Sequence, residues 1–230
     1  MADFRTPEDV KAHYVERMGE ELGLLFHELW QEVALLRIEW GEFIELFGEK
    51  RSRVALMNEA APAFFTMVQR LLWEETLLSI ARLTDPPSSM GKDNLTIRRL
   101  TGCIDDSGTA QEVSRCAKEA ADAADFCRDW RNRRIAHRDL ALATKKETAT
   151  PLELGNRVKV EAALLAIERT LNAVGGYYTG STTHFDLGSR LGGALSMLYA
   201  LRRGAKAEAA WRARLERGEP TSEDREHEEI

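Results

Sequence analysis

The chain has 230 residues, of which 43% are hydrophobic, and a formal net charge of −6. This composition excludes a wholly disordered chain and provides enough apolar residues for one large domain or two small ones. The charge is unevenly spread, with 12 acidic against 5 basic residues in 1–50 and 7 basic against 2 acidic residues in both 126–146 and 187–217. Because the basic residues are segregated, the acidic total does not exclude an anionic ligand.

The cysteines and the hydropathy pattern restrict the setting of the protein. Cys103, Cys116 and Cys127 match no spacing typical of a zinc or redox site. Three unpaired thiols without a signal peptide predict a protein of the reducing cytoplasm. No apolar run approaches the roughly 18 residues that a transmembrane helix needs. We therefore expect a cytoplasmic protein with no membrane partner, no metal and no other cofactor.

Two long helical patterns begin the chain. Apolar residues spaced three and four apart predict a first helix from Pro7 to Phe47, which Gly19 and Gly23 are expected to loosen or kink. A second run over 51–83 contains Pro62, which should kink or restart it. The apolar residues of this second run cover more than one face, so we expect it to be central and buried.

Shorter helices follow. They are predicted over residues 94–103, 110–137, 157–174 and 187–217. Asp93 can cap the first of these, and Gly175-Gly176 is expected to end the third. The segments 84–93 and 138–156 are predicted loops, and no alternating pattern predicts a strand.

The predicted fold class is all-α, a bundle of five or six helices with long first and second helices. We expect a helical domain over 1–186 and a basic C-terminal helix over 187–217 that packs on this domain or extends from it. The residues 218–230 are predicted to be a disordered acidic tail. The basic residues of the last helix either extend an RNA-binding surface or pair with acidic segments, and the sequence does not decide between these roles.

One short stretch concentrates the chemistry of the chain. It contains Arg131, Asn132, Arg133, Arg134, His137, Arg138 and Asp139. The planar fork of an arginine fits a phosphate, and a histidine can move a proton near neutral pH. RNA carries its own nucleophile, the 2′-hydroxyl. Such residues can therefore promote transesterification without a metal, leaving a 2′,3′-cyclic phosphate and a 5′-hydroxyl end.

The geometry of a regular helix complicates this hypothesis. Residues six apart, such as Arg131 and His137, are rotated by about 600°, roughly 120° short of two full turns, whereas Arg133 and His137 share a face. Either the helix ends within the motif, or a second copy of the chain completes the site. A two-fold dimer would bring two such helix ends together.

A structural explanation competes with catalysis. Cations at a helix C-terminus are stabilised by the helix dipole by about 0.3–1 kcal/mol each. Arg133, Arg134 and Arg138 are therefore interpreted as supporting charge. Arg82 and Asp85 either position the motif or form a local ion pair. Asp139 either orients His137 or pairs with Arg138.

Three segments in order resemble a known family. The sequence Arg131-Asn132-x4-His137 is similar to the R-[polar]-x(4–6)-H motif of the HEPN superfamily, which comprises small helical domains, many of them metal-independent RNases. Together with Ala81–Asp85 and Asn94–Thr96, it resembles the abortive-infection U-type branch, over about 30–180. The resemblance implies Arg131 as the phosphate binder, Asn132 as the polar motif residue and His137 as the general acid or base, in a composite dimer site.

Three functions remain open at this point. The leading hypothesis is a homodimeric endoribonuclease of a phage-defence or toxin–antitoxin system, with an antitoxin or another defence protein as a partner. The alternative is a non-catalytic HEPN module that binds nucleotide, RNA or a partner protein. The third is a purely structural oligomer in which Arg131 and His137 seal an interface.

Overall fold

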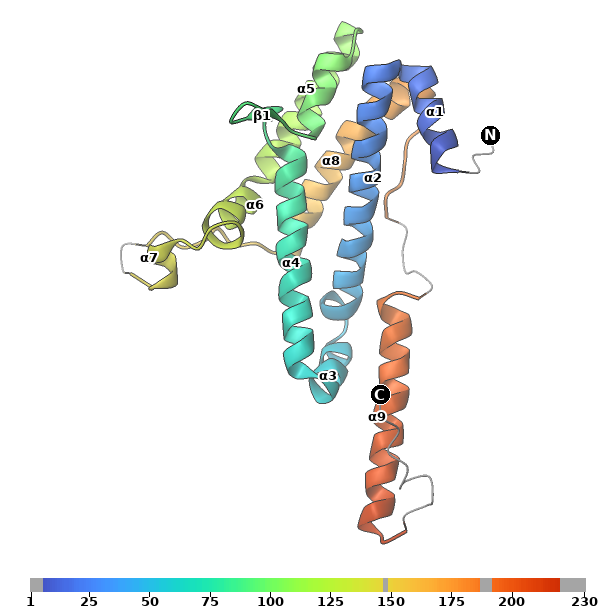
Figure 1. Ribbon diagram of the computed structural model, residues 1–230, viewed down its shortest axis with the longest axis vertical. Helices are drawn as coiled ribbons and strands as arrows, with labels where there is room; N and C mark the ends of the chain where they lie inside the picture. Colours follow the sequence, from blue (N-terminus) through green and yellow to red (C-terminus); the bar gives the residue numbers. More distant parts are fainter. Residues whose placement is uncertain (1–5, 147–148, 187–191, 220–230) are drawn as a thin grey trace. The chain divides into compact units, whose positions relative to one another are not determined.

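The computed structural model describes residues 6–146, 149–186 and 192–219 (Figure 1). Its elements are α1 (Pro7–Met18), α2 (Glu20–Phe43), the π-helix η1 (Ile44–Gly48), α3 (Arg51–Ala60), α4 (Pro62–Thr84), β1 (Ser88–Ser89), β2 (Lys92–Asp93), the 3-10 helix η2 (Ile97–Cys103), α5 (Ser107–Ala123), α6 (Asp125–Trp130), the π-helix η3 (Arg131–Ile135), α7 (Leu140–Ala143), α8 (Arg157–Thr179) and α9 (Ala194–Glu216). The prediction of an all-α fold is confirmed, since β1 and β2 form only a two-residue antiparallel pairing.

The described residues group into two compact units. The first unit comprises residues 6–40, 72–146 and 149–186, and the second comprises 41–71 and 192–219. The division into domains that the sequence suggested, 1–186 and 187–217, stays a prediction. Within the described ranges, no helix combines the length and the apolarity that a membrane span requires.

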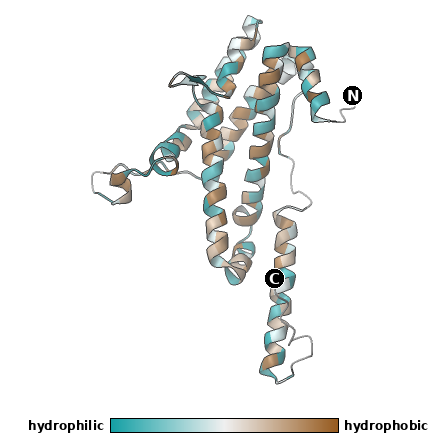
Figure 2. Cartoon of the chain, viewed as in Figure 1, coloured by the Kyte–Doolittle hydropathy of each residue, from teal (hydrophilic) through white to brown (hydrophobic). Residues whose placement is uncertain are grey.

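The core of the first unit is built from the apolar faces of its helices. On α2, the predicted stripe is buried, and each of the following side chains is 3% exposed or less: Leu22, Phe26, Leu29, Val33, Leu36 and Trp40. Residues of α4, α5 and α8 complete this core, including Leu77, Ile80, Val113, Leu164 and Ile167, none of which is exposed. Figure 2 shows the hydrophobic residues running along α2 and α4. Burial of these faces from water is the main force that stabilises the unit.

The long N-terminal helix is interrupted where the sequence contains glycine. Gly19 adopts a φ of 82°, a conformation that disfavours residues with a Cβ, and it separates α1 from α2. Gly23 allows the two helices to approach closely, because a Cβ there would lie 2.6 Å from the Cα of Val15. The expected kink at Gly19 is confirmed as a break, and the single helix from Pro7 to Phe47 is wrong. Pro62 restarts the second run, as predicted.

Three further boundaries differ from the predictions. The short helix begins at Ile97 and is capped by the hydroxyl of Thr96, whereas Asp93 lies in β2. The helix predicted over 110–137 starts at Ser107 and divides into α5, α6 and η3. Helix α8 continues through the glycine pair to Thr179 and ends at Gly180, whose φ is 67°.

The predicted loops contain short regular elements. The loop 84–93 carries the β1–β2 turn, with a φ of 76° at Gly91, and the loop 138–156 contains α7. The last helix is described from Ala194 onward. Residues 187–191 of that prediction, and nearly all of the predicted acidic tail, lie outside the described residues.

The second unit has its own small core. It is formed by Ile44, Leu46, Met57, Phe65 and Leu198, which are all buried. The carboxylate of Glu42 accepts the backbone N–H of Ala194 at 2.5 Å and so caps the N-terminus of α9.

Candidate functional site

The end of α4 is hydrogen-bonded to the segment 94–96, which follows it after the β1–β2 turn. The hydroxyl of Thr96 lies 2.9 Å from the carbonyl oxygen of Leu83 and 2.8 Å from that of Asp85. The amide of Asn94 donates to the carbonyl of Pro86 at 2.9 Å. Because Thr96 is fully buried, these bonds fix the backbone at Asp85 where α4 ends.

Asp85 connects this meeting point to the basic motif. Its Oδ2 accepts a charge-assisted hydrogen bond from Nη1 of Arg131, and the side chains are 20% and 22% exposed, respectively. The Nε of Arg131 donates to Oδ1 of Asn132 at 3.0 Å. An arginine has five N–H donors. The structure therefore fixes Arg131 through one carboxylate and one amide and leaves further donors for a ligand.

The motif does not lie on a regular α-helix. Helix α6 ends at Trp130, and η3 is a π-turn in which the N–H of Ala136 donates to the carbonyl of Arg131 at 2.8 Å. A bond between residues five apart places Ala136 above Arg131, so that His137 follows at the next position. The helix thus changes within the motif, which is one of the two solutions expected from the sequence. Single π-turns of this kind are frequent at functional sites.

His137 and its neighbour Arg138 are open to solvent. Both are exposed, and neither makes a hydrogen bond or an ion pair within the part of the chain that the structure describes. Arg131 and His137 make no hydrogen bond to each other there. Within one chain, the structure therefore presents the imidazole without a partner that would orient it.

Arg133 is occupied by contacts within the chain. It pairs with Asp129 at 3.2 Å and with Asp139 at 3.5 Å. Its guanidinium also donates to the backbone carbonyls of Thr150 and Pro151. The two backbone carbonyls tie the motif to the segment that follows it, and the two carboxylates hold the guanidinium in place, which is a structural role.

Two other candidate cations, Arg134 and Arg82, each interact with a nearby carboxylate. Arg134 lies 3.7 Å from a carboxylate oxygen of Glu74 and 5.6 Å from the ring centre of Trp130. Arg82 binds Glu75 and Ser79 on its own helix, at 2.9 and 2.8 Å. Of the two residues at the end of α4, Asp85 reaches the motif, whereas Arg82 pairs with Glu75 and not with Asp85.

Asp139 caps a helix instead of orienting the imidazole. Its Oδ1 accepts the backbone N–H of Leu142 at 2.9 Å, at the start of α7. This hydrogen bond, followed by the interaction with Arg133, holds the pKa of Asp139 below its usual range. Its side chain makes no hydrogen bond or ion pair with His137 or Arg138, both of which the structure describes.

The contacts of two further residues at the site were not predicted, although Trp130 was expected to face inward. Arg128, one turn before Arg131, donates to the hydroxyl of Thr84 at 3.1 Å and pairs with Asp125. Trp130 stacks edge-on against Trp73, with ring centres 6.2 Å apart, and donates its indole N–H to the carbonyl of Glu153. The spacing of Arg128 from the motif could have indicated its role, but its partners are set only by the tertiary fold.

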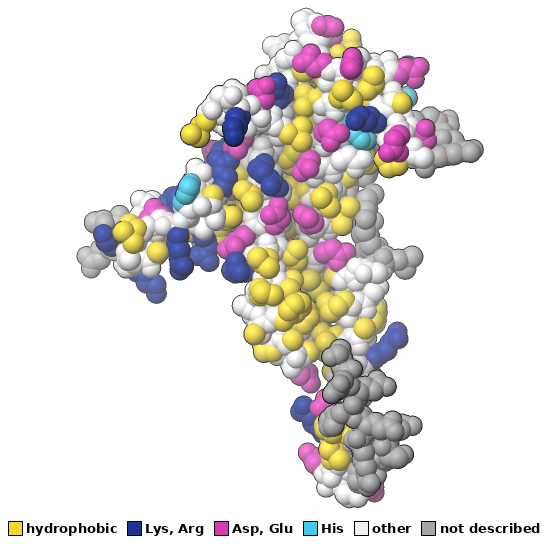
Figure 3. Space-filling view, in the orientation of Figure 1, with side chains coloured by type: hydrophobic (Ala, Val, Ile, Leu, Met, Phe, Trp, Pro, Cys, Tyr) yellow, Lys and Arg dark blue, Asp and Glu magenta, His cyan; other side chains and the backbone are white. Residues whose placement is uncertain are grey.

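Two hollows adjoin the Thr84–Asp85 segment. One, of about 300 Å³, is lined by residues that include Arg82, Asp85 and Asn94. The other, of about 670 Å³, is lined by Thr84 and Arg128 and by the exposed Arg98. Figure 3 shows Lys and Arg side chains gathered on this side of the molecule, around the α6–α7 region. The arrangement can bind the phosphates of an extended anionic chain.

The side chains of the described residues include no group of three or more histidines, cysteines or carboxylates placed to hold a metal ion. The chemistry that this chain itself presents at the site is that of a guanidinium, an amide and an imidazole. Such a set can bind a phosphate and transfer a proton.

The chain matches a known protein family. A HEPN family model described as AbiU2 matches residues 19–191, well over half of the chain. The matched range includes the end of α4, the Asn94–Thr96 segment and the whole motif. Neither the curated proteins nor the solved structures that were compared match the chain.

Proposed function

Because the chain belongs to the AbiU2 family of HEPN domains, an abortive-infection family, we propose that it is a metal-independent endoribonuclease that acts as a homodimer. The observation that carries the proposal is the geometry of the motif. A π-turn places an open imidazole, that of His137, just beyond an arginine that Asp85 fixes in place.

The proposed mechanism uses the chain's own side chains. Arg131 binds the non-bridging oxygens of the scissile phosphate, and Asn132 keeps its guanidinium oriented. One imidazole takes the proton of the 2′-hydroxyl as the 2′-oxygen bonds to phosphorus. The bond from phosphorus to the 5′-oxygen breaks, and a second, protonated imidazole supplies the proton that this leaving oxygen needs. The products are a 2′,3′-cyclic phosphate and a 5′-hydroxyl end.

The need for two imidazoles supports the dimer. His137 is the only histidine of the motif, so the acid and the base come from two copies of the chain. An exposed apolar stripe lies on α8, where Val158 and Leu165 are 77% and 51% exposed. Glu153, just before α8, is bonded through its backbone N–H to Asp129 at 2.9 Å. We propose that a second copy packs on this stripe, which would bring the two motifs together.

The catalytic test uses matched histidine variants. His137→Ala is expected to lower RNA cleavage in EDTA by at least about 100-fold, the usual contribution of general acid–base catalysis. His184→Ala, at another exposed histidine, should leave cleavage unchanged. Circular dichroism checks that both variants keep their helices, and end-group analysis of the product should find the cyclic phosphate. Cleavage that persists in His137→Ala, or that needs a divalent metal, would contradict the proposal.

The dimer is tested separately. Val158→Asp and Leu165→Asp place a charge on the stripe and are expected to convert the dimer to a monomer in light scattering, with loss of cleavage. Leu35→Asp is the control, because Leu35 is 52% exposed on α2 and lies outside the stripe. A wild-type chain that is monomeric at working concentration, or stripe variants that remain dimeric, would contradict this interface.

The non-catalytic HEPN module remains the second candidate function. It is favoured by the ion pair between Arg131 and Asp85, since a phosphate must share the guanidinium with a carboxylate. In this case, wild type and His137→Ala should bind RNA equally, and neither should cleave it.

A further inference from the structure

The second unit has exposed cations that its described residues leave unpaired. Lys50 at the start of α3, and Arg202 and Lys206 on α9, make no hydrogen bond or ion pair within the described ranges. Arg53 differs, because two carboxylates at 2.5 and 3.2 Å neutralise its guanidinium. Arg202 and Lys206 are four residues apart and so share a face of α9. Such a set of charges favours a partner with several negative charges.

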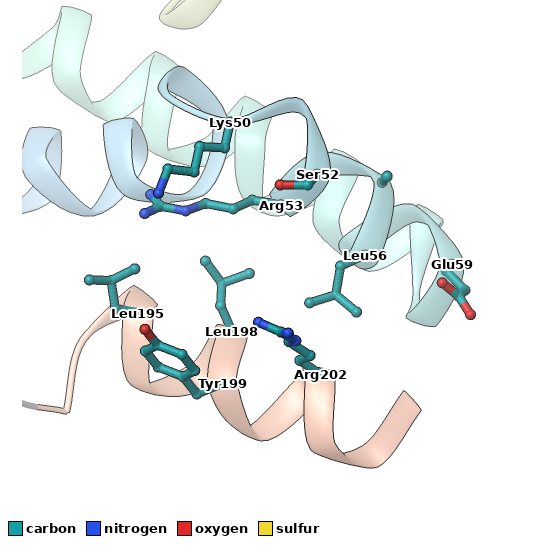
Figure 4. A pocket seen from close by; sticks show the side chains of 10 residues that line it. Lys50, Ser52, Arg53, Leu56, Glu59, Leu195, Leu198, Tyr199 and Arg202 are labelled. Carbon is teal, nitrogen blue, oxygen red and sulfur yellow. The ribbon is translucent and has the colours of Figure 1, made fainter. Parts of the chain in front are cut away.

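Two of these cations line a groove between α3 and α9. The groove has a volume of about 630 Å³, and all of its lining residues belong to the second unit. In Figure 4, the guanidinium of Arg202 extends into the space between the helices, Lys50 and Leu195 lie at one end, and Glu59 lies at the other. Leu195 and Leu198 give the groove an apolar side. A fitting occupant combines negative charges with an apolar group and carries no negative charge beside Glu59.

A second hollow continues from this groove along α9. It has a volume of about 680 Å³ and is lined by Glu59 and Ala60 of α3 and by residues of α9 from Ala200 to Glu216. Glu59 lines both hollows. The lining residues of α9 are mostly small and include Gly204, where an added Cβ would meet no atom within 4 Å. An extended backbone can approach such a surface closely.

The chain leaves α9 in a fixed turn where this hollow ends. Gly218 has a φ of 73°, and the N–H groups of Gly218 and Glu219 donate to the carbonyls of Leu215 and Arg214, both at 3.0 Å. These are the two bonds of a Schellman motif. The position of Glu219 at the end of α9 is therefore set by the backbone.

The sequence of the segment that follows complements the groove. Residues 220–230, which lie outside the described residues, contain five acidic residues and one basic residue, Arg225. Along α9, Glu216 is about 21 Å from Arg202 and about 32 Å from Leu195, at 1.5 Å per residue. Eleven extended residues span about 36 Å at roughly 3.3 Å each. The segment is therefore long enough to run back along α9 to the far end of the groove.

We propose that the acidic segment 220–230 docks into the α3–α9 groove of its own chain. Its carboxylates pair with Lys206, Arg202 and Lys50, in that order along the segment. Because the segment and the groove belong to one chain, the effective concentration is high, so that individually weak exposed pairs suffice. The docking occupies the cations of the second unit and does not depend on RNA cleavage.

The other side chains of the segment fit the remaining features of the groove. Arg225 is the sixth residue of the segment and lies up to about 20 Å from the end of α9, which brings it to the level of Glu59. Ile230 is the only large apolar residue of the segment, and it packs against Leu195 and Leu198 at the far end.

The first test is carbodiimide cross-linking of the full chain, which joins a lysine amine to a carboxylate that it contacts. Peptide mapping by mass spectrometry should find Lys50 and Lys206 joined to residues 223–229. Lys118, whose side chain is 81% exposed in the first unit, is the control and should not be joined to them. The absence of the Lys50 cross-link, or equal cross-linking of Lys118, would overturn the proposal.

An isotope mixture tests which chain supplies the segment. When unlabelled and nitrogen-15 chains are mixed before cross-linking, the joined peptides should carry a single label. Mixed labels would mean that a second copy supplies the segment and would overturn docking within one chain. Cross-links to Lys145 or Lys146, which follow the motif, in place of Lys50 would place the segment at the motif and overturn the groove.

Matched charge variants then locate the docked segment. Arg202→Glu should lower the rate of the Lys50 cross-link at least about threefold, because like charges oppose each other across an interface. Arg203→Glu makes the same change in net charge at an exposed arginine that lines neither hollow, and it should leave the rate unchanged. An equal loss in Arg203→Glu would show attraction by net charge alone and would overturn the site.

A last variant tests the apolar contact without altering charge. Ile230→Ser should also slow the Lys50 cross-link, whereas Thr221→Ala, at an uncharged residue near the start of the segment, should not. Circular dichroism checks that every variant keeps its helices. An unchanged rate in Ile230→Ser would mean that the segment does not enter the groove.

Discussion

Two arginines of the first unit bind carboxylates in contrasting ways. Arg37 on α2 bridges Glu161, at 2.8 Å, and Glu168, and its side chain is only 7% exposed. Arg131 has a single carboxylate partner and is 22% exposed. Both are fixed, but only Arg131 keeps donors near solvent. An arginine that is buried between two carboxylates has a structural role, whereas a partly exposed arginine with a single carboxylate partner remains able to bind a phosphate.

The guanidinium of Arg37 is held by hydrogen bonds to two carboxylates. Burial alone would lower the pKa of Arg37, but the hydrogen bonds from its guanidinium to Glu168 and Glu161 outweigh this effect and raise the pKa above its usual value. The indole N–H of Trp40 also donates to Glu161 at 2.6 Å. The network joins α2 to α8 through charges that are largely removed from water.

The largest expected effect comes from breaking this network. Arg37→Met should lower the free energy of unfolding by about 3–5 kcal/mol, because it leaves two carboxylates without their cation. Arg131→Met should cost only about 0–1 kcal/mol, as for a partly exposed pair. Urea denaturation followed by circular dichroism measures both. Adding Glu168→Gln to Arg37→Met should recover part of the loss, and equal losses in the two single variants would refute the distinction.

A smaller effect is expected from removing Asp85, the carboxylate partner of Arg131. Asp85→Asn loosens the guanidinium, and since a misplaced group lowers catalysis, cleavage at saturating RNA should fall about tenfold. The fold should lose no more than about 1 kcal/mol. Asp93→Asn is the control, because Asp93 forms an exposed pair with Arg99 at 2.9 Å. Unchanged cleavage in Asp85→Asn would show that Arg131 does not need this carboxylate; this prediction depends on the proposed RNase activity.

The sequence was informative wherever local patterns decide the structure. Spacings of three and four located the buried stripe of α2, and the missing N–H of Pro62 located the start of α4. The cap of η2 was assigned to Asp93 instead of Thr96, because both residue types can cap and only the contacts of Thr96 with the end of α4 distinguish them. Likewise, nothing local indicates that η3 widens into a π-turn.

Long-range pairs explain what sequence analysis missed at the site. The ordered segments indicated that the end of α4 belongs with the motif, and the structure joins Asp85 to Arg131 across 46 positions. The sequence could not show that Arg133 forms ion pairs with Asp129 and Asp139, because no local pattern distinguishes the four neighbouring arginines. Arg37 was hidden for the same reason, because its partners lie 124 and 131 residues away.

The smallest effect tests how Arg133 and α7 depend on Asp139. The hydrogen bond from the N–H of Leu142, and then the interaction with Arg133, lower the pKa of Asp139, so its charged form is favoured in the folded chain. The stabilisation is therefore present above the ordinary carboxyl pKa of about 3.9 and is lost as the pH falls through the lower folded value.

Hydrogen exchange at Leu142, corrected for its intrinsic pH dependence, should show protection at pH 6 that falls as the solution is acidified toward pH 3. Asp139→Asn keeps an acceptor for the cap but no titrating group, so its protection should not depend on this ionisation. A wild-type profile as flat as that of Asp139→Asn would mean that the charge of Asp139 does not hold this end of the motif, and that the contacts of Arg133 with Asp129 and the backbone suffice.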